Sequence, residues 1–308
     1  MLDDWRHRSS LGRVIWMGWM ELGLDNEARD LRRFATASSV RLRWKTDGAV
    51  VSRNGTSLVV RPDIGDVYAS IKYFDLYATR AQILNGRKIA DYRPPFRWLS
   101  LEVNKTIWFT SLPEVMAVVP GYLARYKLKE GDRVFDVGAY CGETTLAFGQ
   151  LVGTSGKIYS FEPDQINYEM LTRNIHEQEA TNVMPIQKGL SGKTGETLFR
   201  HGEGLAAQIA SGPRKGGAPV EVLSYPDACA LAGGEPDFVK MDVEGAEIEI
   251  IRAALPHLKQ SRTRFAIASY HLVDGQPSSI ALEELFRSIG YKVETGNPEH
   301  QTTWAWRE

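Results

Sequence analysis

Short apolar runs alternate with amphipathic segments along the chain from about residue 130 onward. The apolar runs have the length of buried strands, and between them apolar residues recur with the spacing of one helix face. Strands that alternate with helices in this way predict βαβ units and a mostly parallel sheet covered on both faces. The predicted strands cover residues 133–138, 157–163, 183–189, 236–243 and 264–271, and a terminal hairpin covers 291–296 and 302–308.

Three of the amphipathic segments have a clear apolar face and are predicted to be helices. In the last of them, Ser278 or Ser279 is the expected N-cap, and Gly290 is the expected stop after the final turn. The faces consist of Tyr168, Leu171 and Ile175; of Ile248, Ile251 and Leu255; and of Leu282, Leu285, Phe286 and Ile289.

The first 125 residues carry mixed signals and predict a separate region, a mixed α/β cap or oligomerisation region. Its clearest element is a hairpin around Asn54 and Gly55, because both residues can adopt the positive φ of a two-residue type I′ turn. Residues 97–111 predict a further strand, whereas 67–86 fit helical and strand spacing equally. Residues 126–308 are predicted to form one domain.

Two segments depart from these patterns. Residues 201–219 are rich in Gly and Pro and predict a long loop, either a lid or a disordered insert. Val14–Met20 follows basic residues, but Glu21 interrupts the apolar run and no cleavage pattern follows, so an amphipathic helix is expected there rather than a signal peptide. No apolar run approaches the roughly 18 residues that a membrane-spanning helix requires.

Charge and cysteine content narrow the class of protein. The formal net charge is −1, so no general electrostatic attraction to nucleic acid or to an anionic membrane is expected. Cys141 and Cys229 are the only cysteines, which excludes a disulfide framework and favours a reducing compartment, the cytoplasm.

The first predicted strand leads into a loop that fits a ligand. Ligands of open parallel sheets bind outside the carboxyl ends of the strands. Asp136 stands at that end, and Gly138 and Gly142 follow before a helix whose free N–H groups favour an anionic group. The G-x-x-x-G spacing lacks the middle glycine of the dinucleotide fingerprint. A tight βα turn without a ligand would also explain these glycines.

Acidic residues and a histidine follow the other predicted strands. Glu162 ends the second strand, about 20 residues after the glycine loop, where a carboxylate can accept hydrogen bonds from both hydroxyls of a ribose. Asp242, Glu244 and Glu247 follow the fourth strand, with the two glutamates at the start of the next helix, and His271 ends the fifth. Such a group is costly unless it is paired, catalytic or bound to a metal.

These motifs together resemble one known family. "FDVGAYCGETTLAF", "IYSFEPDQINYEMLTRNI" and "DFVKMDVEGAEIEII", in this order, are similar to the FkbM-type family of S-adenosylmethionine-dependent methyltransferases. The resemblance covers roughly residues 115–308. It implies an α/β fold, the class I (Rossmann-like) methyltransferase with a seven-stranded, mostly parallel sheet whose last strand is antiparallel. It also implies O-methylation of a hydroxyl on a sugar, glycan or natural product, with S-adenosylmethionine as cofactor and S-adenosylhomocysteine as product.

The resemblance assigns a role to individual residues. Glu162 would bind the ribose, Ser191 would contact the adenine, and Asp242 would lie beside the methionine and the reacting centre. The family often has Asn-Ile-Gly where this chain has Tyr140-Cys141-Gly142, and many members have a Glu where Ser269 and Tyr270 precede the histidine. The complete expected cofactor site consists of Asp136, Gly138, Ala139, Tyr140, Gly142, Thr144, Glu162, Pro163, Ser191 and Asp242.

The expected chemistry is an in-line displacement of the methyl group by the acceptor oxygen. His271 is the expected general base because the ordinary histidine pKa, near 6.5, suits that task, and Asp242 is the second expected catalytic residue. Asp242, Glu244 and His271 could also hold Mg²⁺ or Mn²⁺, but the spacing demands no metal and none is expected. Two other functions stay open: a nicotinamide-dependent oxidoreductase and a non-catalytic scaffold. The expected partners are a small-molecule or carbohydrate substrate and, through the N-terminal region, a second copy of the chain.

Overall fold

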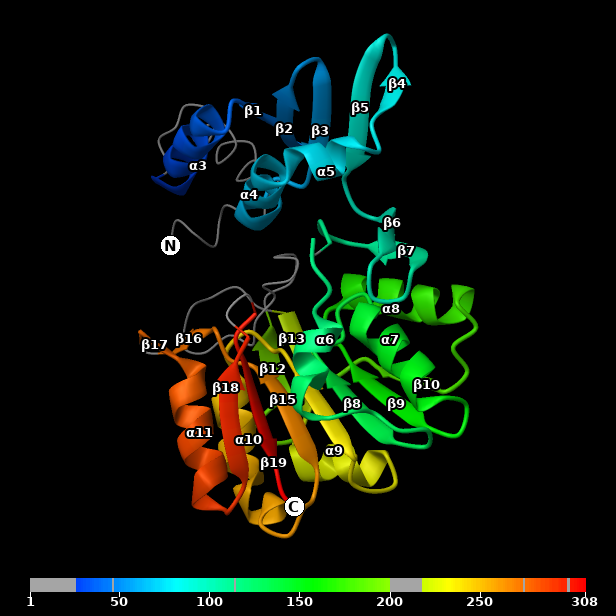
Figure 1. Cartoon of the computed structure of the whole chain (residues 1–308), viewed down its shortest axis with the longest axis vertical. Coiled ribbons are helices and arrows are strands. Elements are labelled where there is room, and N and C mark those ends of the chain that lie inside the picture. Colours follow the sequence, from blue (N-terminus) through cyan, green and yellow to red (C-terminus); the bar gives the residue numbers. More distant parts are fainter. Residues whose placement is uncertain (1–25, 46, 114, 200–217, 274, 298–299) are drawn as a thin grey trace. The chain divides into compact units, whose positions relative to one another are not determined.

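The computed structural model describes residues 26–45, 47–113, 115–199, 218–273, 275–297 and 300–308 (Figure 1). The chain divides into two compact units. Unit 1 consists of residues 1–97 and 109–115, and unit 2 of residues 98–108 and 116–308. The helix expected at Val14–Met20 and most of the loop expected at 201–219 lie outside the described residues.

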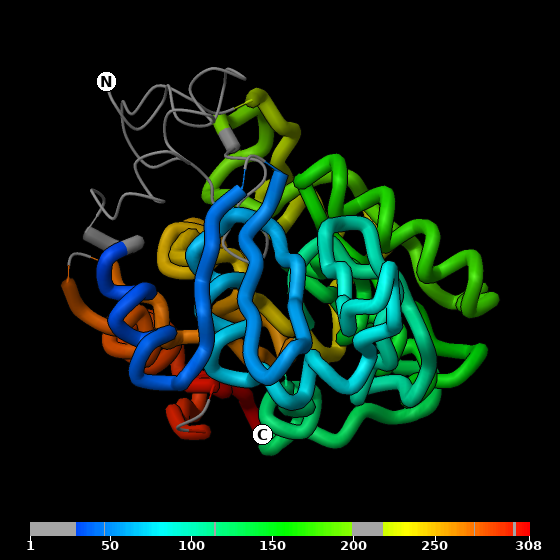
Figure 2. The backbone as a smooth tube through the Cα atoms, turned by 90° about the horizontal axis from the view of Figure 1, so that it is seen from above, coloured from blue at the N-terminus to red at the C-terminus, as the bar shows by residue number. Residues whose placement is uncertain are grey.

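Unit 1 is built on a five-stranded sheet with the order β1-β2-β3-β5-β4. Asn54 and Gly55 have φ values of 50° and 78°, which confirms the expected hairpin turn. Figure 2 shows the strands of this hairpin side by side. The unsettled segment 67–86 proves to be helical first and extended afterwards. The elements of this unit are α3 (Asn26–Ala37), β1 (Arg41–Lys45), β2 (Gly48–Arg53), β3 (Thr56–Val60), α4 (Ile64–Lys72), α5 (Phe74–Ala78), β4 (Gln82–Leu84) and β5 (Arg87–Tyr92).

Residues 97–111 form two strands where the sequence predicted one. β6 (Phe96–Ser100) and β7 (Lys105–Phe109) make a small two-stranded sheet. Asn104 has a φ of 52°, the left-handed conformation that Asn adopts readily in turns, so the chain reverses just before β7. Apolar residues continue on both sides of this turn, so the hydrophobic pattern does not predict it.

Unit 2 contains a seven-stranded sheet with the order β10-β9-β8-β14-β15-β19-β18. Five strands are parallel to their neighbours, and β19 is antiparallel to both β15 and β18. The expected sheet with an antiparallel last strand is confirmed. Its strands are β8 (Arg133–Val137), β9 (Lys157–Phe161), β10 (Val183–Ile186), β14 (Phe238–Met241), β15 (Arg264–Ala268), β18 (Lys292–Gly296) and β19 (Thr302–Trp306).

Helices cover both faces of this sheet. The crossovers from β8 to β10 run in one direction and the crossover from β14 to β15 runs in the other, so right-handed connections place their helices on opposite faces. The N-cap of the last helix is Pro277, not Ser278 or Ser279 as expected, while Gly290 follows its end with a φ of 85°. The helices are α6 (Val119–Tyr122), η1 (Leu123–Arg125), α7 (Glu143–Val152), α8 (Gln165–Glu177), α9 (Tyr225–Leu231), α10 (Glu247–Leu258) and α11 (Ser278–Ser288).

Short strands that the sequence analysis did not predict complete unit 2. β11 (Gly189–Leu190), β13 (Ala218–Leu223) and β12 (Gly195–Phe199) form a three-stranded sheet in this order. β16 (Leu272–Val273) and β17 (Gln276–Pro277) pair after β15. Strands of two residues carry no periodicity, so a hydrophobic pattern cannot reveal them.

Residues in the core of unit 2 hold in place the strands β8, β9, β14 and β15, which all end at one edge of the sheet. Phe135, Phe161 and Phe265 lie on three of these strands, and each is at most 1% exposed. Because the four strands are parallel, the residues after them meet at one edge. Among the described residues, no helix is long and apolar enough to cross a membrane.

Candidate active site

The loop between β8 and α7 passes very close to the chain after β14. Gly138 has a φ of 77°, and a Cβ atom there would lie 1.9 Å from the backbone oxygen of Asp242. Gly142 has a φ of 92°, and its Cβ would lie 2.6 Å from Leu171 Cδ1. The backbone contact leaves room only for glycine at Gly138, and the positive φ favours glycine at both places whether or not a ligand binds.

Asp136 is completely buried beneath this loop and has several partners. Its Oδ2 accepts hydrogen bonds from the hydroxyls of Thr144 (2.7 Å) and Thr145 (2.6 Å). The Lys240 ammonium lies 3.2 Å from Asp136 Oδ1 and donates to the Gly138 carbonyl at 2.7 Å. Asp136 therefore anchors the start of α7, and Lys240 joins β14 to the glycine loop.

Lys240 is a site residue that the sequence analysis missed. It is 4% exposed and stands directly opposite Asp136 in the register of β8 and β14. A buried lysine is rarely found without an ionic partner. The lysine in the apolar run "DFVKMDV" was therefore a usable signal, but only the strand register identifies its partner.

Glu162 faces the glycine loop from the end of β9. Its carboxylate accepts hydrogen bonds from the backbone N–H groups of Tyr140 and Asp164, each at 2.9 Å. Burial raises the pKa of Glu162 to about 8, although these hydrogen bonds act in the opposite direction. Asp164, not Glu162, caps α8, because its side chain accepts hydrogen bonds from two backbone N–H groups of that helix. Glu162 thus holds the glycine loop at the end of β9, and its role toward a ligand stays a prediction.

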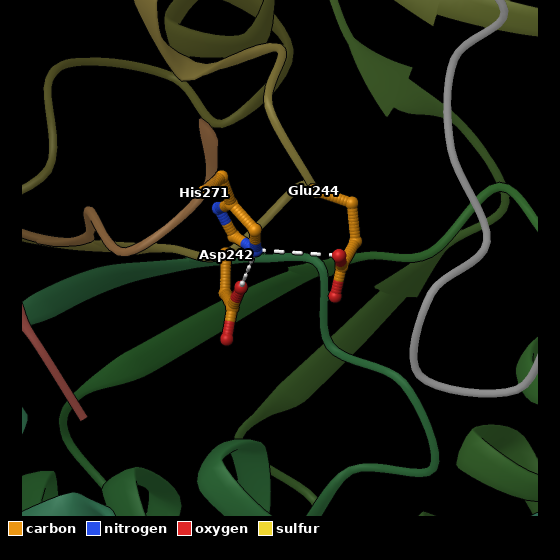
Figure 3. A group of neighbouring side chains, drawn as sticks. All are labelled: Asp242, Glu244 and His271. Atoms are coloured by element: carbon orange, nitrogen blue, oxygen red, sulfur yellow. Dashed lines mark ion pairs between the residues drawn. The ribbon is translucent and has the colours of Figure 1, made fainter. Parts of the chain in front are cut away.

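The structure gathers three carboxylates and an imidazole after β14 and β15. Figure 3 shows Asp242, Glu244 and His271 of this group. His271 Nε2 lies 3.2 Å from Glu244 Oε2 and 3.7 Å from Asp242 Oδ1. On the other side of the ring, Nδ1 lies 3.2 Å from Glu247 Oε1. Two expectations of placement were wrong: Glu244 precedes α10 in a loop with a φ of 56°, and His271 lies beyond β15, which ends at Ala268.

The charges of this cluster shift the pKa values of its members. Burial disfavours the charged ring, but contacts with Glu244 and Glu247 and the charge of Asp242 raise the pKa of His271 to about 10. The ring is then protonated at neutral pH, so the argument from an ordinary pKa near 6.5 was wrong. Burial also raises the pKa of Glu244. For Asp242 burial is outweighed by His300, Lys240 and His271, which lower its pKa to about 2.

Tyr122 and His300 extend the cluster, and the sequence analysis identified neither. The Tyr122 hydroxyl donates to Asp242 Oδ2 at 2.9 Å and lies 3.3 Å from His300 Nε2. Trp304 Nε1 donates to the Tyr122 carbonyl at 3.1 Å, which ties α6 to β19. These residues come from segments far apart in the sequence and belong to no motif, so only the fold brings them to Asp242.

The other expected cofactor residues lie around the same edge. Ser191, after β11, is buried and donates to Glu249 Oε1 at 3.3 Å. Pro163 lies near Gly189, where an added Cβ would be 3.6 Å from it. Both cysteines are buried, and neither forms a disulfide bond. The roles of these residues toward a cofactor stay predictions.

Comparisons with known proteins place this site in a family. The Methyltransferase FkbM domain matches residues 136–293, just over half of the chain. The hexuronic acid methyltransferase AglP of Haloferax volcanii is 27% identical over 146 residues, which is 46% of this chain and 57% of that protein. A probable cobalt-precorrin-6B C(15)-methyltransferase of Sulfurisphaera tokodaii is 23% identical over 51% of this chain and 76% of its own length.

Among solved structures, the methyltransferase FkbM of Methylobacillus flagellatus aligns with a TM-score of 0.45 and 16% identity. That alignment covers 91% of this chain and 60% of the other. The chain thus spans less than two thirds of the hexuronic acid methyltransferase and of this structure. The match covers the glycine loop, Glu162, the Asp242 cluster and the strands that carry them, and it shows that the chain belongs to the FkbM family of S-adenosylmethionine-dependent methyltransferases.

Proposed function

We propose that this protein transfers a methyl group from S-adenosylmethionine to a hydroxyl of a sugar, glycan or natural product. The observation that carries the proposal is the cluster of Asp242, Glu244 and His271 directly beside the Gly138 loop. Acid–base groups at this place suit an acceptor that loses a proton as it gains a methyl group. The name of the Haloferax relative, a hexuronic acid methyltransferase, supports a carbohydrate acceptor.

In this proposal the cofactor lies along the strand ends. Its methionine end contacts the loop from Gly138 to Gly142, its ribose binds Glu162, and its adenine lies near Ser191. Glu162 already accepts two backbone hydrogen bonds, and its fixed position suits a pair of ribose hydroxyls. Asp136 acts from below by holding Thr144 and the start of α7. The remaining members of the proposed cofactor site are Ala139, Tyr140, Pro163 and Asp242.

Alignment of the acceptor oxygen with the methyl group is the main catalytic task. Fixed geometry of this kind can supply roughly 7–11 kcal/mol of the barrier. Asp242 and His271 are the proposed catalytic residues, since they lie where the Gly138 loop meets the end of β14. Only the neutral form of His271 can take the proton of the acceptor hydroxyl. The ring must therefore lose the proton that it carries before it can act as a base.

Other expectations of the sequence analysis concern alternative functions, partners and location. Membership of a methyltransferase family argues against the nicotinamide-dependent oxidoreductase. A non-catalytic scaffold would bind the cofactor without turnover on any hydroxylated compound. The N-terminal region as cap or oligomerisation region, the absence of nucleic acid partners and the cytoplasmic location stay predictions.

Calorimetric titration with S-adenosylhomocysteine tests the cofactor site. Glu162→Gln keeps the size of the side chain and replaces one of its two acceptor oxygens with an amide group that can only donate. A ribose hydroxyl that loses its acceptor costs about 1–3 kcal/mol, so the affinity should fall about 5- to 150-fold. Glu169→Gln, an exposed change on α8 whose side chain contacts Gln165, is the matched control and should bind as the unchanged protein does.

Methyl transfer is then measured by mass spectrometry with hexuronic acids, neutral sugars and their glycosides as acceptors. Transfer to a hydroxyl that depends on His271 and Asp242 is the expected result. If millimolar S-adenosylhomocysteine produces no heat of binding and no protection of the backbone from hydrogen exchange, the proposed function is wrong. If the cofactor binds but no hydroxylated acceptor is methylated, the scaffold is the better description.

A further inference from the structure

The cluster after β14 has the composition of a cation site. Single ligand atoms of Asp242, Glu244 and His271 all lie within 4.8 Å of one another. Atoms bound to one ion at about 2.1 Å lie about 3 to 4 Å apart, so a small movement of Glu244 in its loop would bring the three around an ion. Carboxylate oxygens suit Mg²⁺ and Mn²⁺, and imidazole extends the range toward heavier transition metals.

A second observation points to a missing ligand at this place. The His271 side chain is 9% exposed, and neither ring nitrogen makes a hydrogen bond of good geometry in the described part of the chain. Asp242 Oδ1 is also buried without a hydrogen-bond partner among the described residues. Figure 3 shows this oxygen and the carboxylate of Glu244 facing the same nitrogen of the ring. Buried polar atoms are nearly always satisfied, so His271 Nε2 and Asp242 Oδ1 point to a ligand that binds both of them.

Glu247 orients the ring as second-layer carboxylates do in metal sites. The carboxylate is completely buried, its Oε1 lies 3.2 Å from Nδ1, and the same atom accepts the Val243 N–H at 3.0 Å. A carboxylate held in this way keeps the proton on Nδ1 and leaves the Nε2 lone pair to a metal. The ring is thus held with Nε2 toward Asp242 and Glu244.

We propose that Asp242, Glu244 and His271 bind one divalent cation, Mg²⁺ or Mn²⁺, and that this cation receives the acceptor hydroxyl. The proposal rests on the proposed function, replaces the expectation that no metal is needed, and makes His271 a ligand of the cation instead of a general base. The two carboxylates balance the charge of the ion, and the imidazole is its neutral ligand. The cation weakens the acceptor O–H bond, and the proton leaves to water. The oxygen then forms a bond to the methyl carbon, and the electron pair of the broken S–CH₃ bond stays on sulfur.

Binding of Mn²⁺ alone, followed by electron paramagnetic resonance, tests the site without any acceptor. The full chain, saturated with S-adenosylhomocysteine, should bind one Mn²⁺ per chain. Glu244→Gln and His271→Gln should each weaken Mn²⁺ binding at least tenfold, because each removes one ligand. Mg²⁺ should displace the Mn²⁺ in competition. Glu283→Gln and His257→Gln are matched controls, since these residues make ion pairs with Arg287 and Glu235 instead, and they should bind Mn²⁺ unchanged.

The outcomes separate this proposal from the one on which it rests. Glu244 belongs to none of the proposed cofactor contacts, so Glu244→Gln should bind S-adenosylhomocysteine within twofold of the unchanged protein, which also shows that the variant folds. The cation site would be overturned if the chain failed to bind Mn²⁺ at millimolar concentration, or if Glu244→Gln bound Mn²⁺ as tightly as the unchanged chain does. Intact binding of S-adenosylhomocysteine in the same samples would still support the proposed methyltransferase. Mn²⁺ binding without cofactor binding would overturn the proposed function instead.

Discussion

The contact between Gly138 and the backbone of Asp242 is the tightest constraint on a single residue at the site. A Cβ atom at Gly138 would lie 1.9 Å from the Asp242 oxygen, and the φ of 77° disfavours any side chain. We expect Gly138→Ala to destabilise unit 2 by several kcal/mol, because backbone atoms on both sides must separate. Denaturant unfolding followed by tryptophan fluorescence measures the loss.

Gly233→Ala separates the effect of the contact from the effect of the backbone angle. Gly233 has a φ of 72°, almost the same as Gly138, but an added Cβ would meet nothing within 4 Å. Its cost should stay near the 1–2 kcal/mol of a left-handed alanine. Equal losses for the two variants would show that the close approach of the two chain segments is not what requires Gly138.

At the residue scale, the sequence predicts site residues that belong to motifs. It does not predict those whose partners are determined by strand register or by the tertiary fold. Asp136, Gly138, Glu162 and Asp242 lie at or just after the ends of apolar strands and could be predicted from that position. Tyr122 could not, because it lies in a short helix of four residues and meets Asp242 only through the tertiary fold. The protonation of His271 was also beyond the sequence, since it depends on three carboxylates that the fold brings around one ring.

At the scale of elements, α4 carries a buried carboxylate that makes the stability of unit 1 depend on pH. Asp66 accepts the Leu112 N–H at 3.0 Å and lies 3.4 Å from Arg61 Nε. Burial and the charge of Asp63 raise the pKa of Asp66 to about 7 against the opposing effects of Arg61 and the Leu112 N–H. The folded unit then holds a proton that the unfolded chain releases above about pH 4.

Unit 1 should therefore lose stability as the pH rises from about 4 to 7, by up to about 1.4 kcal/mol per pH unit. Asp66→Asn cannot ionise and should remove this slope. Hydrogen exchange of peptides from α4 and residues 109–113, corrected for intrinsic rates, measures the effect. Asp75→Asn changes an exposed carboxylate and should keep the slope of the unchanged chain. A slope that survives in Asp66→Asn would contradict the assignment.

The strands of the seven-stranded sheet were predictable from the sequence, whereas β12, β13 and the two-residue strands were not. The strands β8, β9, β14 and β15 appear as apolar runs because both of their faces are buried, as in any parallel sheet with helices on both sides. β11, β16 and β17 have two residues each, too few for any pattern. The extended segment 264–271 was predicted as one strand, although the chain leaves the sheet after Ala268, and that departure carries His271 toward Asp242 and Glu244.

At the scale of the whole molecule, the division into two units determines what a cofactor can stabilise. Every residue of the proposed cofactor site belongs to unit 2. A ligand that binds only the folded state stabilises it by about 2.7 kcal/mol at 100 times its dissociation constant. S-adenosylhomocysteine should therefore slow the opening of unit 2 and leave the opening of unit 1 at its own rate.

Hydrogen exchange with and without S-adenosylhomocysteine measures this difference in one experiment. Slower exchange is expected in the glycine loop with the start of α7, in residues 161–165 and around Asp242, where backbone N–H groups are held by the loop and strand contacts described above. The strands of unit 1 should exchange as before, and Glu162→Gln at the same ligand concentration should lose most of the protection. Protection of β1, β2 and β3 equal to that of unit 2 would contradict the prediction, because it would mean that the two units open together or that unit 1 contributes directly to the cofactor site.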